Sequence, residues 1–527
     1  MAYIKKAFGP PGTGKTTWIV EQTAELVRRG EVNPYNIAST SLTKATKEAL
    51  LHKLDNKGVK IKSENIRTLH SWAYQSLKTD TYTPYVLKHT EIAEFFKSKG
   101  FEFKTEDGGS EDDEFIQAEY HETEGNRLYQ AFNKLRLTWD GSNPTEHIYR
   151  FYERERDEMP ISAKSFFSLF KDFVKWLQNE GVYDYTRLLT EAYKNRATIS
   201  GDLLILDEYQ DKGNLHNLIV KEWLKHFKYA LVCGDDDQAI FTFAGSDPKH
   251  LIELEADETY ILPMSYRLPS KIHDFAMRII KENRYRVPKE FKPYKEGGRV
   301  EWLFSFDDVL VELNGKQTFI LARNKYFVQE WGQILEMEDI PYRVIGRKQL
   351  IPDLAKHIRT HLRLLGGEAV DDESLTKLIT ALKPLIRSLT GKKQIRESVV
   401  ASIREKIKKR DFSGEEGKVV YLVLSREPER LFVDHDEIVV KRWKKRARNL
   451  ERWQNPNISI GTIHSAKGLE ADTVFLDTRI TKKVLESGIK DQEAGRRVLY
   501  VGITRAREEL YLVQPGGAYT YEHLELL

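Results

Sequence analysis

The feature that most constrains this chain is a glycine-rich loop near its start. The apolar stretch YIKKAF runs directly into GPPGTGKTT, and the helix-like segment WIVEQTAELVRR follows. The loop fits the pattern G-x-x-x-x-G-K-[ST] in the strand-loop-helix context in which that pattern binds phosphate. A chance match is the alternative, and the context argues against it.

The residue types of this P-loop predict how it binds phosphate. Successive backbone amides form an anion nest at a helix N-terminus, and the glycines allow close approach. Lys15 would reach the β and γ phosphates, and Thr16 offers a hydroxyl to Mg²⁺. We expect a nucleoside triphosphate to bind at Gly9, Pro10, Pro11, Gly12, Thr13, Gly14, Lys15, Thr16 and Thr17.

Further apolar runs are predicted to be buried strands of parallel sheets. Turn or acidic residues bound them, and helical patterns such as KATKEALLHKL separate them. The runs are NIAST (36–40), DLLILDE (202–208), YALVCGD (229–235), TFILAR (318–323) and TVFLD (473–477). This order indicates α/β architecture, and the spread of strands over 527 residues indicates two sheets.

Two long stretches between the strand-rich parts have helical character. Residues 79–182 contain SAKSFFSLFKDFVKWLQNE, and residues 347–455 contain ESLTKLITALKPLIRSL and QIRESVVASIREKIKKR. Within the second stretch, KVVYLVLS and DEIVV have the composition of a strand pair. We expect both stretches to be insertions within sheet domains.

The run LLILDEYQD contains a predicted strand that is followed by two carboxylates. Asp207 can hold Mg²⁺, and Glu208 can orient or deprotonate an attacking water, which is the chemistry of hydrolysis. An acidic pair at a strand end is otherwise a turn or a cap. The P-loop upstream favours the catalytic interpretation.

Composition and cysteine content limit the class of protein. Hydrophobic residues make up 40% of the chain and charged residues 31%, as in soluble globular proteins. The single cysteine, Cys233, lies in an apolar run, so we expect a core residue and a reducing compartment. Neither a signal-peptide core nor an apolar run of membrane-spanning length is present. We expect a cytoplasmic protein, or a nuclear one in a host with a nucleus, and no membrane partner.

The net charge of +3 conceals strong local imbalance. The stretch FEFKTEDGGSEDDEFIQAEYHETEGN (101–126) is acidic and is predicted to be a solvated loop or helix face. The stretch KRWKKRARNLERW (441–453) is basic, with Trp443 and Trp453 between the cations. Two interpretations of it stay open, a solvated helix and a nucleic-acid-binding segment.

Five segments after the P-loop carry a resemblance to a known family. In order they are LLILDEYQD, VCGDDDQAIFTFAGS, LPMSYRLPS, ISIGTIHSAKGLEADTVFLD and RRVLYVGITRAREEL. With them the chain resembles the UvrD/Rep/PcrA helicases of superfamily 1A over nearly its whole length. The resemblance implies two RecA-like motor domains with parallel sheets, each interrupted by a mainly helical accessory insertion. The implied ranges are 1–78 and 183–265 for motor domain 1A, 79–182 for accessory domain 1B, 266–346 and 456–527 for motor domain 2A, and 347–455 for accessory domain 2B.

The resemblance also implies roles in the nucleotide cleft. Gln238 would sense the γ phosphate and the attacking water, and Tyr266 would stack on the base. Arg267 would contact the γ phosphate, Arg505 resembles the arginine finger, and Glu470 resembles the residue that meets the ribose. Cations supplied by a second domain stabilise the transition state only when the cleft is shut, so hydrolysis becomes coupled to closure. For Arg505 the alternative is an ordinary surface ion pair.

The segment GDDDQAIFTFAGS joins a phosphate-type cluster to two phenylalanines. In an extended segment Phe241 and Phe243 point the same way and form one face suited to stacking on bases. From the pattern alone a core position explains both rings better, and the resemblance favours stacking on a single strand. Four further residues resemble family positions near the backbone of the bound strand, although a lone histidine is usually structural: His70, Ser71, Thr462 and His464.

We expect an ATP-dependent translocase on single-stranded DNA and a DNA helicase of 3' to 5' polarity, with ATP and Mg²⁺ as cofactors. The alternatives are an ATPase that remodels or strips nucleoprotein complexes without processive unwinding, and a nucleotide-gated binding protein. Expected partners are single-stranded DNA, duplex junctions and loading, replication or repair proteins, with RNA less favoured. Selectivity for ATP stays open, because none of the eight residues before Gly9 is a glutamine that could read adenine. The short second insertion is typical of a compact viral or plasmid member.

Overall fold

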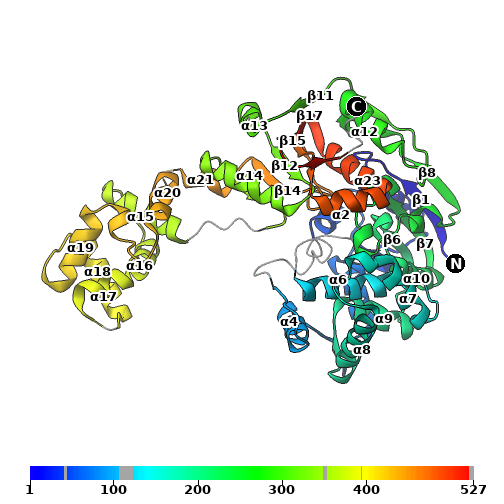
Figure 1. Cartoon of the computed structure of the whole chain (residues 1–527), viewed down its shortest axis with the longest axis horizontal. Coiled ribbons are helices and arrows are strands. Elements are labelled where there is room, and N and C mark those ends of the chain that lie inside the picture. Colours follow the sequence, from blue (N-terminus) through cyan, green and yellow to red (C-terminus); the bar gives the residue numbers. More distant parts are fainter. Residues whose placement is uncertain (41–43, 106–122, 348–352, 393, 448, 522–527) are drawn as a thin grey trace. The chain divides into compact units, whose positions relative to one another are not determined.

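The computed structural model of the protein describes residues 1–40, 44–105, 123–347, 353–392, 394–447 and 449–521 (Figure 1). It divides into two compact units, residues 1–331 with 460–527 and residues 332–459. Most of the acidic stretch predicted at 101–126 lies outside the described residues. Within the described residues, helices long and apolar enough to span a bilayer are absent. The finer division into four domains stays a prediction.

The first sheet of the larger unit is parallel and has six strands. In spatial order they are β3 (Ile66–Arg67), β2 (Ile37–Thr40), β6 (Gly201–Leu206), β7 (Phe227–Gly234), β1 (Tyr3–Phe8) and β8 (Glu258–Ile261). The helices of this part are α1 (Lys15–Arg28), α2 (Lys44–Asp55), α3 (Leu69–Leu77), α9 (Tyr185–Lys194), α10 (Asn214–Trp223) and α11 (Lys249–Ile252). The strands predicted at 36–40, 202–208 and 229–235 are confirmed.

Both faces of this sheet are covered, which explains why its strands are continuous apolar runs. Leu203 and Ile205 of β6 pack in one core with residues of α1 and α2. Leu204 and Leu206 point to the opposite face and pack with residues of α3, α9 and α10. Cys233 is a buried free thiol in the first of these cores, as predicted.

An accessory segment interrupts this part of the chain after α3. Its helices are α4 (His89–Ser98), α6 (Glu124–Leu137), α7 (Pro144–Glu155) and α8 (Ala163–Asn179), and β4 (Tyr85–Val86) pairs with β5 (Val182–Tyr183) where the segment begins and ends. A separate core of aromatic side chains, including Phe96, Phe132, Phe166 and Phe173, holds these helices together. The predicted helical insertion therefore has a hydrophobic core of its own.

The second sheet of the larger unit is also built on parallel pairs. In spatial order five of its strands are β11 (Arg299–Leu303), β17 (Ala506–Val513), β15 (Ala471–Asp477), β12 (Thr318–Ala322) and β14 (Ile458–Thr462). The helices here are α12 (Ser270–Ile280), α13 (Phe306–Glu312), α14 (Lys325–Met337), α22 (Lys482–Lys490) and α23 (Gln492–Ile503). Two small ribbons accompany it, β9 (Met264–Pro269) with β10 (Lys292–Lys295) and β16 (Arg479–Ile480) with β18 (Tyr519–Thr520). The strands predicted at 318–323 and 473–477 are confirmed.

The smaller unit is mainly helical and is coloured from yellow-green to orange in Figure 1. Its elements are β13 (Tyr342–Val344), α15 (Asp353–Leu365), α16 (Asp372–Ala381), α17 (Lys383–Thr390), α18 (Glu397–Lys409), α19 (Gly414–Ser425), α20 (Glu437–Ala447) and α21 (Leu450–Gln454). Leu382 separates α16 from α17, and Pro384 occupies the first turn of α17, where its missing amide costs nothing.

The predicted strand pair KVVYLVLS and DEIVV is wrong. The first segment lies in α19 and the second in α20. Val419, Val420 and Val423 of α19 recur at helical spacing and are fully buried against the neighbouring helices. Packing of this apolar stripe outweighs the β propensity of valine, which spans only about 1 kcal/mol.

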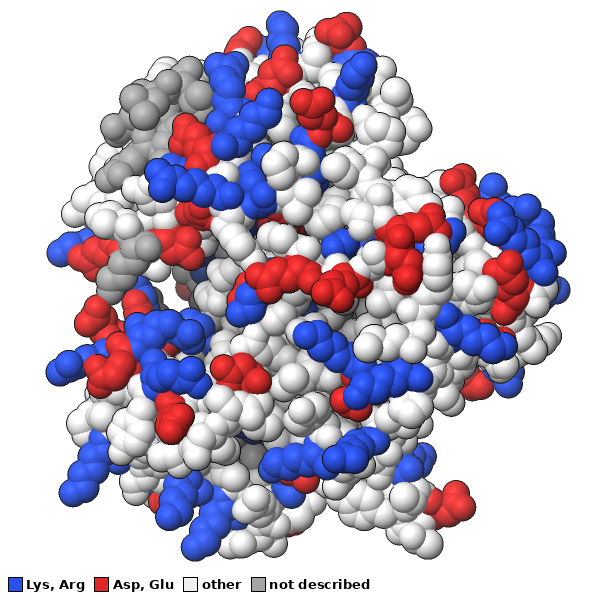
Figure 2. Space-filling view, turned by 90° about the vertical axis from the view of Figure 1, so that its right-hand side faces the viewer, with Lys and Arg blue, Asp and Glu red and all other residues white. Residues whose placement is uncertain are grey.

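The basic run 441–453 is explained by packing within the smaller unit. Arg446 is 5% exposed, donates to Asp339 Oδ1 at 2.8 Å and lies 3.9 Å from the centre of the Trp453 ring. Trp443 contacts Trp453 edge-on, with ring centres 6.1 Å apart. The structure favours a structural role for these two tryptophans over base stacking. On the face shown in Figure 2, basic and acidic side chains are interspersed.

We predict that Arg446→Ala destabilises the smaller unit. Removing a buried cation leaves Asp339 with one partner and a gap between two tryptophans, which costs roughly 2–4 kcal/mol. Lys445 is the matched control, because it also pairs with Asp339, at 3.0 Å, but its side chain is 75% exposed. Lys445→Ala is expected to cost less than about 1 kcal/mol. Urea unfolding followed by tryptophan fluorescence measures both, and equal losses would contradict the assignment.

Candidate nucleotide and nucleic-acid site

The P-loop lies between β1 and α1, as predicted. Gly12 and Gly14 have φ of +75° and +83°, a region that glycine adopts without steric cost. Gly14 is the N-cap of α1 and supplies no capping side chain. The first amides of α1 are therefore open to an anion, which the helix dipole also attracts.

Lys15 lies between the loop and the first acidic strand end. Its Nζ donates to the carbonyl oxygen of Gly9 at 3.1 Å and lies 3.5 Å from Glu208 Oε1. Burial lowers the pKa of Lys15, but the carboxylates of Glu208 and Asp235 raise it by a larger amount. The pKa of Lys15 therefore lies above its ordinary value. The ammonium group stays charged inside the site.

The two carboxylates that follow β6 differ in their electrostatics. Burial and then the charge of Glu208 raise the pKa of Asp207 to about 6. Burial also raises the pKa of Glu208, but Lys15 and Lys467 outweigh it and lower that pKa to about 2. Among the described residues Asp207 forms no ion pair, so a cation arriving beside it would relieve the cost of its burial.

Two cations from the second sheet reach the strand ends of the first. Lys467, between β14 and β15, donates to both carboxylate oxygens of Asp211 at 2.7 and 2.6 Å and to the carbonyl of Gln238 at 2.6 Å. Arg505, between α23 and β17, donates to Gln238 Oε1 at 3.2 Å. Lys467 and Arg505 therefore contact the backbone and the side chain of Gln238, respectively.

Arg505 is a buried cation whose partners are neutral. It is 1% exposed and donates to the carbonyls of Val501 and Leu469 as well as to Gln238. Among the described residues it forms no ion pair with a carboxylate. Burial and then the nearby charge of Arg267 lower the pKa of Arg505 to about 9, so it is protonated at neutral pH. The alternative of an ordinary surface ion pair is therefore wrong. A nearby anion would stabilise the buried Arg505 guanidinium.

Strand β9 connects the P-loop with the second sheet. The Tyr266 amide donates to the carbonyl of Gly12 at 2.8 Å, and its side chain is 66% exposed. Arg267 donates to Glu470 Oε2 at 2.6 Å and to the carbonyl of Thr504 at 3.3 Å. The predicted cleft residues Tyr266, Arg267, Glu470 and Arg505 are therefore brought together next to the P-loop.

The segment with Phe241 and Phe243 is not extended, so the expectation of side chains alternating as in a strand is wrong. Residues Thr242–Ala244 form a 3₁₀ turn. The two rings still touch, with centres 6.2 Å apart and planes tilted by 58°, and His464 lies against both. Phe241 is buried and has the Lys467 ammonium 5.0 Å from its ring centre, whereas Phe243 is partly exposed.

The other predicted strand contacts fall in two places. His70 and Ser71 lie in the first turn of α3, where the Ser71 amide donates to Thr68. The His70 ring packs edge-on against two other rings, and burial lowers its pKa to about 4. Thr462 accepts from the amide of Ser465 and lies two residues before His464 at the phenylalanines. The structure joins His464 to the aromatic pair and leaves His70 in a neutral, packed position.

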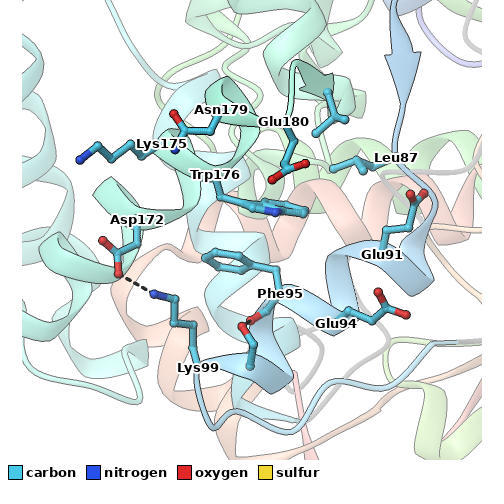
Figure 3. Close-up of a pocket in the computed structure, with 12 residues that line it drawn as sticks. Leu87, Glu91, Glu94, Phe95, Lys99, Asp172, Lys175, Trp176, Asn179 and Glu180 are labelled. Atoms are coloured by element: carbon cyan, nitrogen blue, oxygen red, sulfur yellow. Dashed lines mark hydrogen bonds and ion pairs between the residues drawn. The ribbon is translucent and has the colours of Figure 1, made fainter.

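A surface pocket of about 590 Å³ lies in the accessory segment between α4 and α8 (Figure 3). Phe95 stacks on Trp176 with ring centres 4.9 Å apart, and Lys99 pairs with Asp172 at 2.7 Å on its rim. The residues predicted to bind nucleotide or DNA do not line this pocket. It is a feature of the accessory helices rather than of the predicted site.

Sequence reasoning missed three cations of the site. Lys467 lies within the quoted segment SAKGLE. Its position between two predicted strands of the second sheet was a usable signal. Arg286 and Lys289 lie in an irregular segment between α12 and β10, where no local pattern marks them. They pair with Asp235, Asp236 and Asp237, which were predicted to be a phosphate-type cluster.

Comparisons with known proteins agree with this geometry. Residues 8–259 match the family model of the UvrD/REP helicase N-terminal domain, and residues 438–515 match that of the UvrD-like helicase C-terminal domain. A probable DNA helicase II homolog of Mycoplasma capricolum is 24% identical over 97% of this chain and 82% of its own length. The ATP-dependent DNA helicase PcrA of Staphylococcus epidermidis is 22% identical over 95% and 80%, and the putative ATP-dependent DNA helicase YjcD of Bacillus subtilis is 23% identical over 96% and 76%. The two family models together cover more than half of the chain, which therefore belongs to the UvrD/Rep-like helicase family.

We predict that Gly12→Ala destabilises the protein more than Gly30→Ala does. Both glycines have φ near +75°, so both alanines incur about 1–2 kcal/mol of backbone strain. A Cβ at Gly12 would also meet Ser265 Oγ at 2.8 Å and the Arg267 side chain, whereas one at Gly30 has nothing within 4 Å. The crowding adds roughly 1–3 kcal/mol, measured by urea unfolding. Equal losses would mean that the contact between the P-loop and β9 is absent in solution.

Proposed function

We propose that this chain is an ATP-dependent DNA helicase that moves along single-stranded DNA with 3' to 5' polarity. The relatives described above are named DNA helicases, two of them as ATP-dependent. The observation that carries the proposal is Arg505, a buried guanidinium with neutral partners, bonded to Gln238 at the strand ends beside the P-loop. A nearby anion stabilises a buried cation of this kind, and a nucleotide phosphate supplies such an anion.

In this proposal ATP binds across the P-loop with its phosphates at the N-terminus of α1. Lys15 neutralises the terminal phosphates, and the exposed ring of Tyr266 stacks on the base. Glu208, ionised at neutral pH, orients or deprotonates the attacking water. Arg505 and Arg267 meet the charge that spreads over the equatorial oxygens of the transition state.

Asp207 and Thr16 are the residues that would hold Mg²⁺. One carboxylate and one hydroxyl suit Mg²⁺, which keeps waters and phosphate oxygens as its other ligands. Groups of three or more His, Cys, Asp or Glu side chains able to form a metal cage do not occur among the described residues. The raised pKa of Asp207 fits a carboxylate that is completed by a cation. Bound there, Mg²⁺ would neutralise charge on the transferring phosphate.

Coupling between hydrolysis and movement is proposed to run through the 235–243 segment. Lys467 bonds the carbonyl of Gln238 and lies over the Phe241 ring, so it contacts both the phosphate-sensing residue and the aromatic pair. A shift of Gln238 on phosphate release would therefore move Phe241, Phe243 and His464 together. Of these rings only Phe243 is partly exposed, and stacking of its ring on bases is independent of sequence, as a translocating motor requires. The buried, unpaired Cys233 suits a reducing compartment, and the proposed place of action is the cytoplasm.

We predict that Lys15→Ala lowers the DNA-stimulated ATPase kcat by about 100-fold or more, because it removes the cation at the terminal phosphates. Lys5→Ala is the matched control. Lys5 precedes the loop on β1 and pairs with Glu258 at 3.3 Å, outside the site. Its turnover is expected to stay within about twofold of the unmodified protein. Unchanged hydrolysis in Lys15→Ala would refute the nucleotide site.

We predict that Phe243→Ala keeps basal ATPase activity and loses unwinding per ATP, by about tenfold, because one base stack contributes roughly 1–3 kcal/mol. Phe304→Ala, which removes a ring that is 65% exposed beyond β11, should leave coupling unchanged.

Strand displacement on duplexes with 3' or 5' tails measures the coupling, with ATP and GTP compared. Preference for a 5' tail would contradict the proposed polarity. Displacement of a DNA-bound protein without strand separation would identify a stripping ATPase instead. Slow ATPase activity without directional movement would identify a nucleotide-gated binding protein.

A further inference from the structure

The three aspartates that follow β7 are buried and paired with cations from the 284–289 segment. Lys289 has a fully buried side chain, and its Nζ lies 3.3, 2.5 and 2.9 Å from carboxylate oxygens of Asp235, Asp236 and Asp237. Arg286 pairs with both oxygens of Asp237, at 2.8 and 2.7 Å. The aspartates are therefore occupied by the protein's own cations.

One of these contacts leads directly to Gln238. Asp235 Oδ2 accepts a hydrogen bond from Gln238 Nε2 at 2.7 Å, while Asp235 Oδ1 faces Lys289. The other end of the Gln238 amide, Oε1, accepts from Arg505 at 3.2 Å. Lys289, Asp235, Gln238 and Arg505 thus form a continuous chain of polar contacts.

We propose that Lys289 is a positioning residue for ATP hydrolysis, which acts through Asp235 to orient the side-chain amide of Gln238. The inference rests on the proposed function of Gln238 as the sensor of the γ phosphate. With Nε2 held by Asp235, the amide presents Oε1 to Arg505. The amide is then fixed in one of its two orientations before the nucleotide arrives.

The chemistry of the cluster supports a positioning role over simple stabilisation. Asp235 and Lys289 have no exposed side-chain surface, and burying such a pair costs about as much as its attraction returns. Buried pairs are therefore weak evidence for stability and are better explained by the geometry they fix. Without Lys289, the Asp235 carboxylate would be left with less positive charge nearby and would protonate or turn away from Gln238.

The 284–289 segment has anchors that do not involve Lys289. The amide of Val287 donates to Asp236 Oδ2 at 2.9 Å, and Arg497 of α23 donates to the carbonyls of Asp236 and Tyr285 at 3.2 and 2.7 Å. Together with the Arg286 pair, these contacts fix the segment on the strand end. Loss of the Lys289 charge should therefore affect Asp235 and Gln238 more than the path of the backbone.

The test is Lys289→Met, which keeps the length of the side chain and removes its charge. We expect the DNA-stimulated kcat to fall by about tenfold to 100-fold, while the ATP dissociation constant stays within about threefold, because the orientation of Gln238 matters in the transition state. In the Gln238→Ala background the same substitution should change kcat by less than about threefold, since residues that act as one unit are not additive.

Lys6→Met is the matched control. Lys6, in β1, is also a buried lysine. Its ammonium lies 5.2 Å from the centre of the Phe8 ring, and that of Lys289 lies 5.8 Å from the same ring centre. Its hydrogen-bond acceptors are the carbonyls of Leu251, Ile252 and Leu254. Lys6→Met should lower thermal stability and leave kcat within about threefold.

Each outcome decides the inference. A normal kcat in Lys289→Met, or a loss of kcat that multiplies with that of Gln238→Ala, would overturn it. An equal loss of kcat in Lys6→Met would also overturn it, because any buried lysine would then have the same effect. If Lys289→Met does not fold, Asp235→Asn is measured instead, alone and in the Gln238→Ala background. The same changes in kcat are expected. Absence of DNA-stimulated ATPase activity in the unmodified protein would instead refute the proposed function.

Discussion

The hydrogen bond from Arg505 to the Gln238 amide is the contact on which the proposed site depends. Arg505 follows α23 on the way into the second sheet, and Gln238 follows the β7 strand of the first. In parallel sheets the strand ends lead into the crevice where ligands bind. Because this guanidinium reaches from one sheet to the strand ends of the other, both sheets contribute to the proposed nucleotide site. The P-loop alone could bind phosphate, but it could not sense whether the second sheet is in place.

Buried charge is concentrated where the two sheets of the larger unit meet. Lys467 with Asp211 and Lys289 with Asp235 are buried pairs that each join residues distant in the sequence. Such pairs add little net stability, because desolvation offsets attraction, but they define one geometry and are costly to break. Polar contacts of this kind can also be exchanged for contacts with a charged ligand, which apolar packing does not permit. We therefore propose that the contacts of these charged side chains are the ones that rearrange when a nucleotide binds.

The sequence predicted most of what local chemistry determines. The P-loop, the strand ends at Asp207 and Glu208 and both parallel sheets followed from glycine spacing and apolar runs. Two predictions of local structure were wrong. The valines of α19 lie in a helix because tertiary packing overrides their β propensity, and Phe243 lies in the 3₁₀ turn Thr242–Ala244 instead of an extended segment. Lys289 could not be found, since its importance comes only from three aspartates more than fifty residues earlier in the chain. The distant partners of a buried charge leave no periodic signal.

In the proposed mechanism a cation from the second sheet, Arg505, completes the chemistry of the first. Single-turnover hydrolysis of ATP by Arg505→Ala, with saturating single-stranded DNA, tests it most directly. We expect a rate lower by about 10³-fold or more, as for loss of an arginine finger, with ATP binding retained within about threefold. A hydrolysis rate close to that of the unmodified protein would contradict it, because the first sheet would then hydrolyse ATP without help from the second.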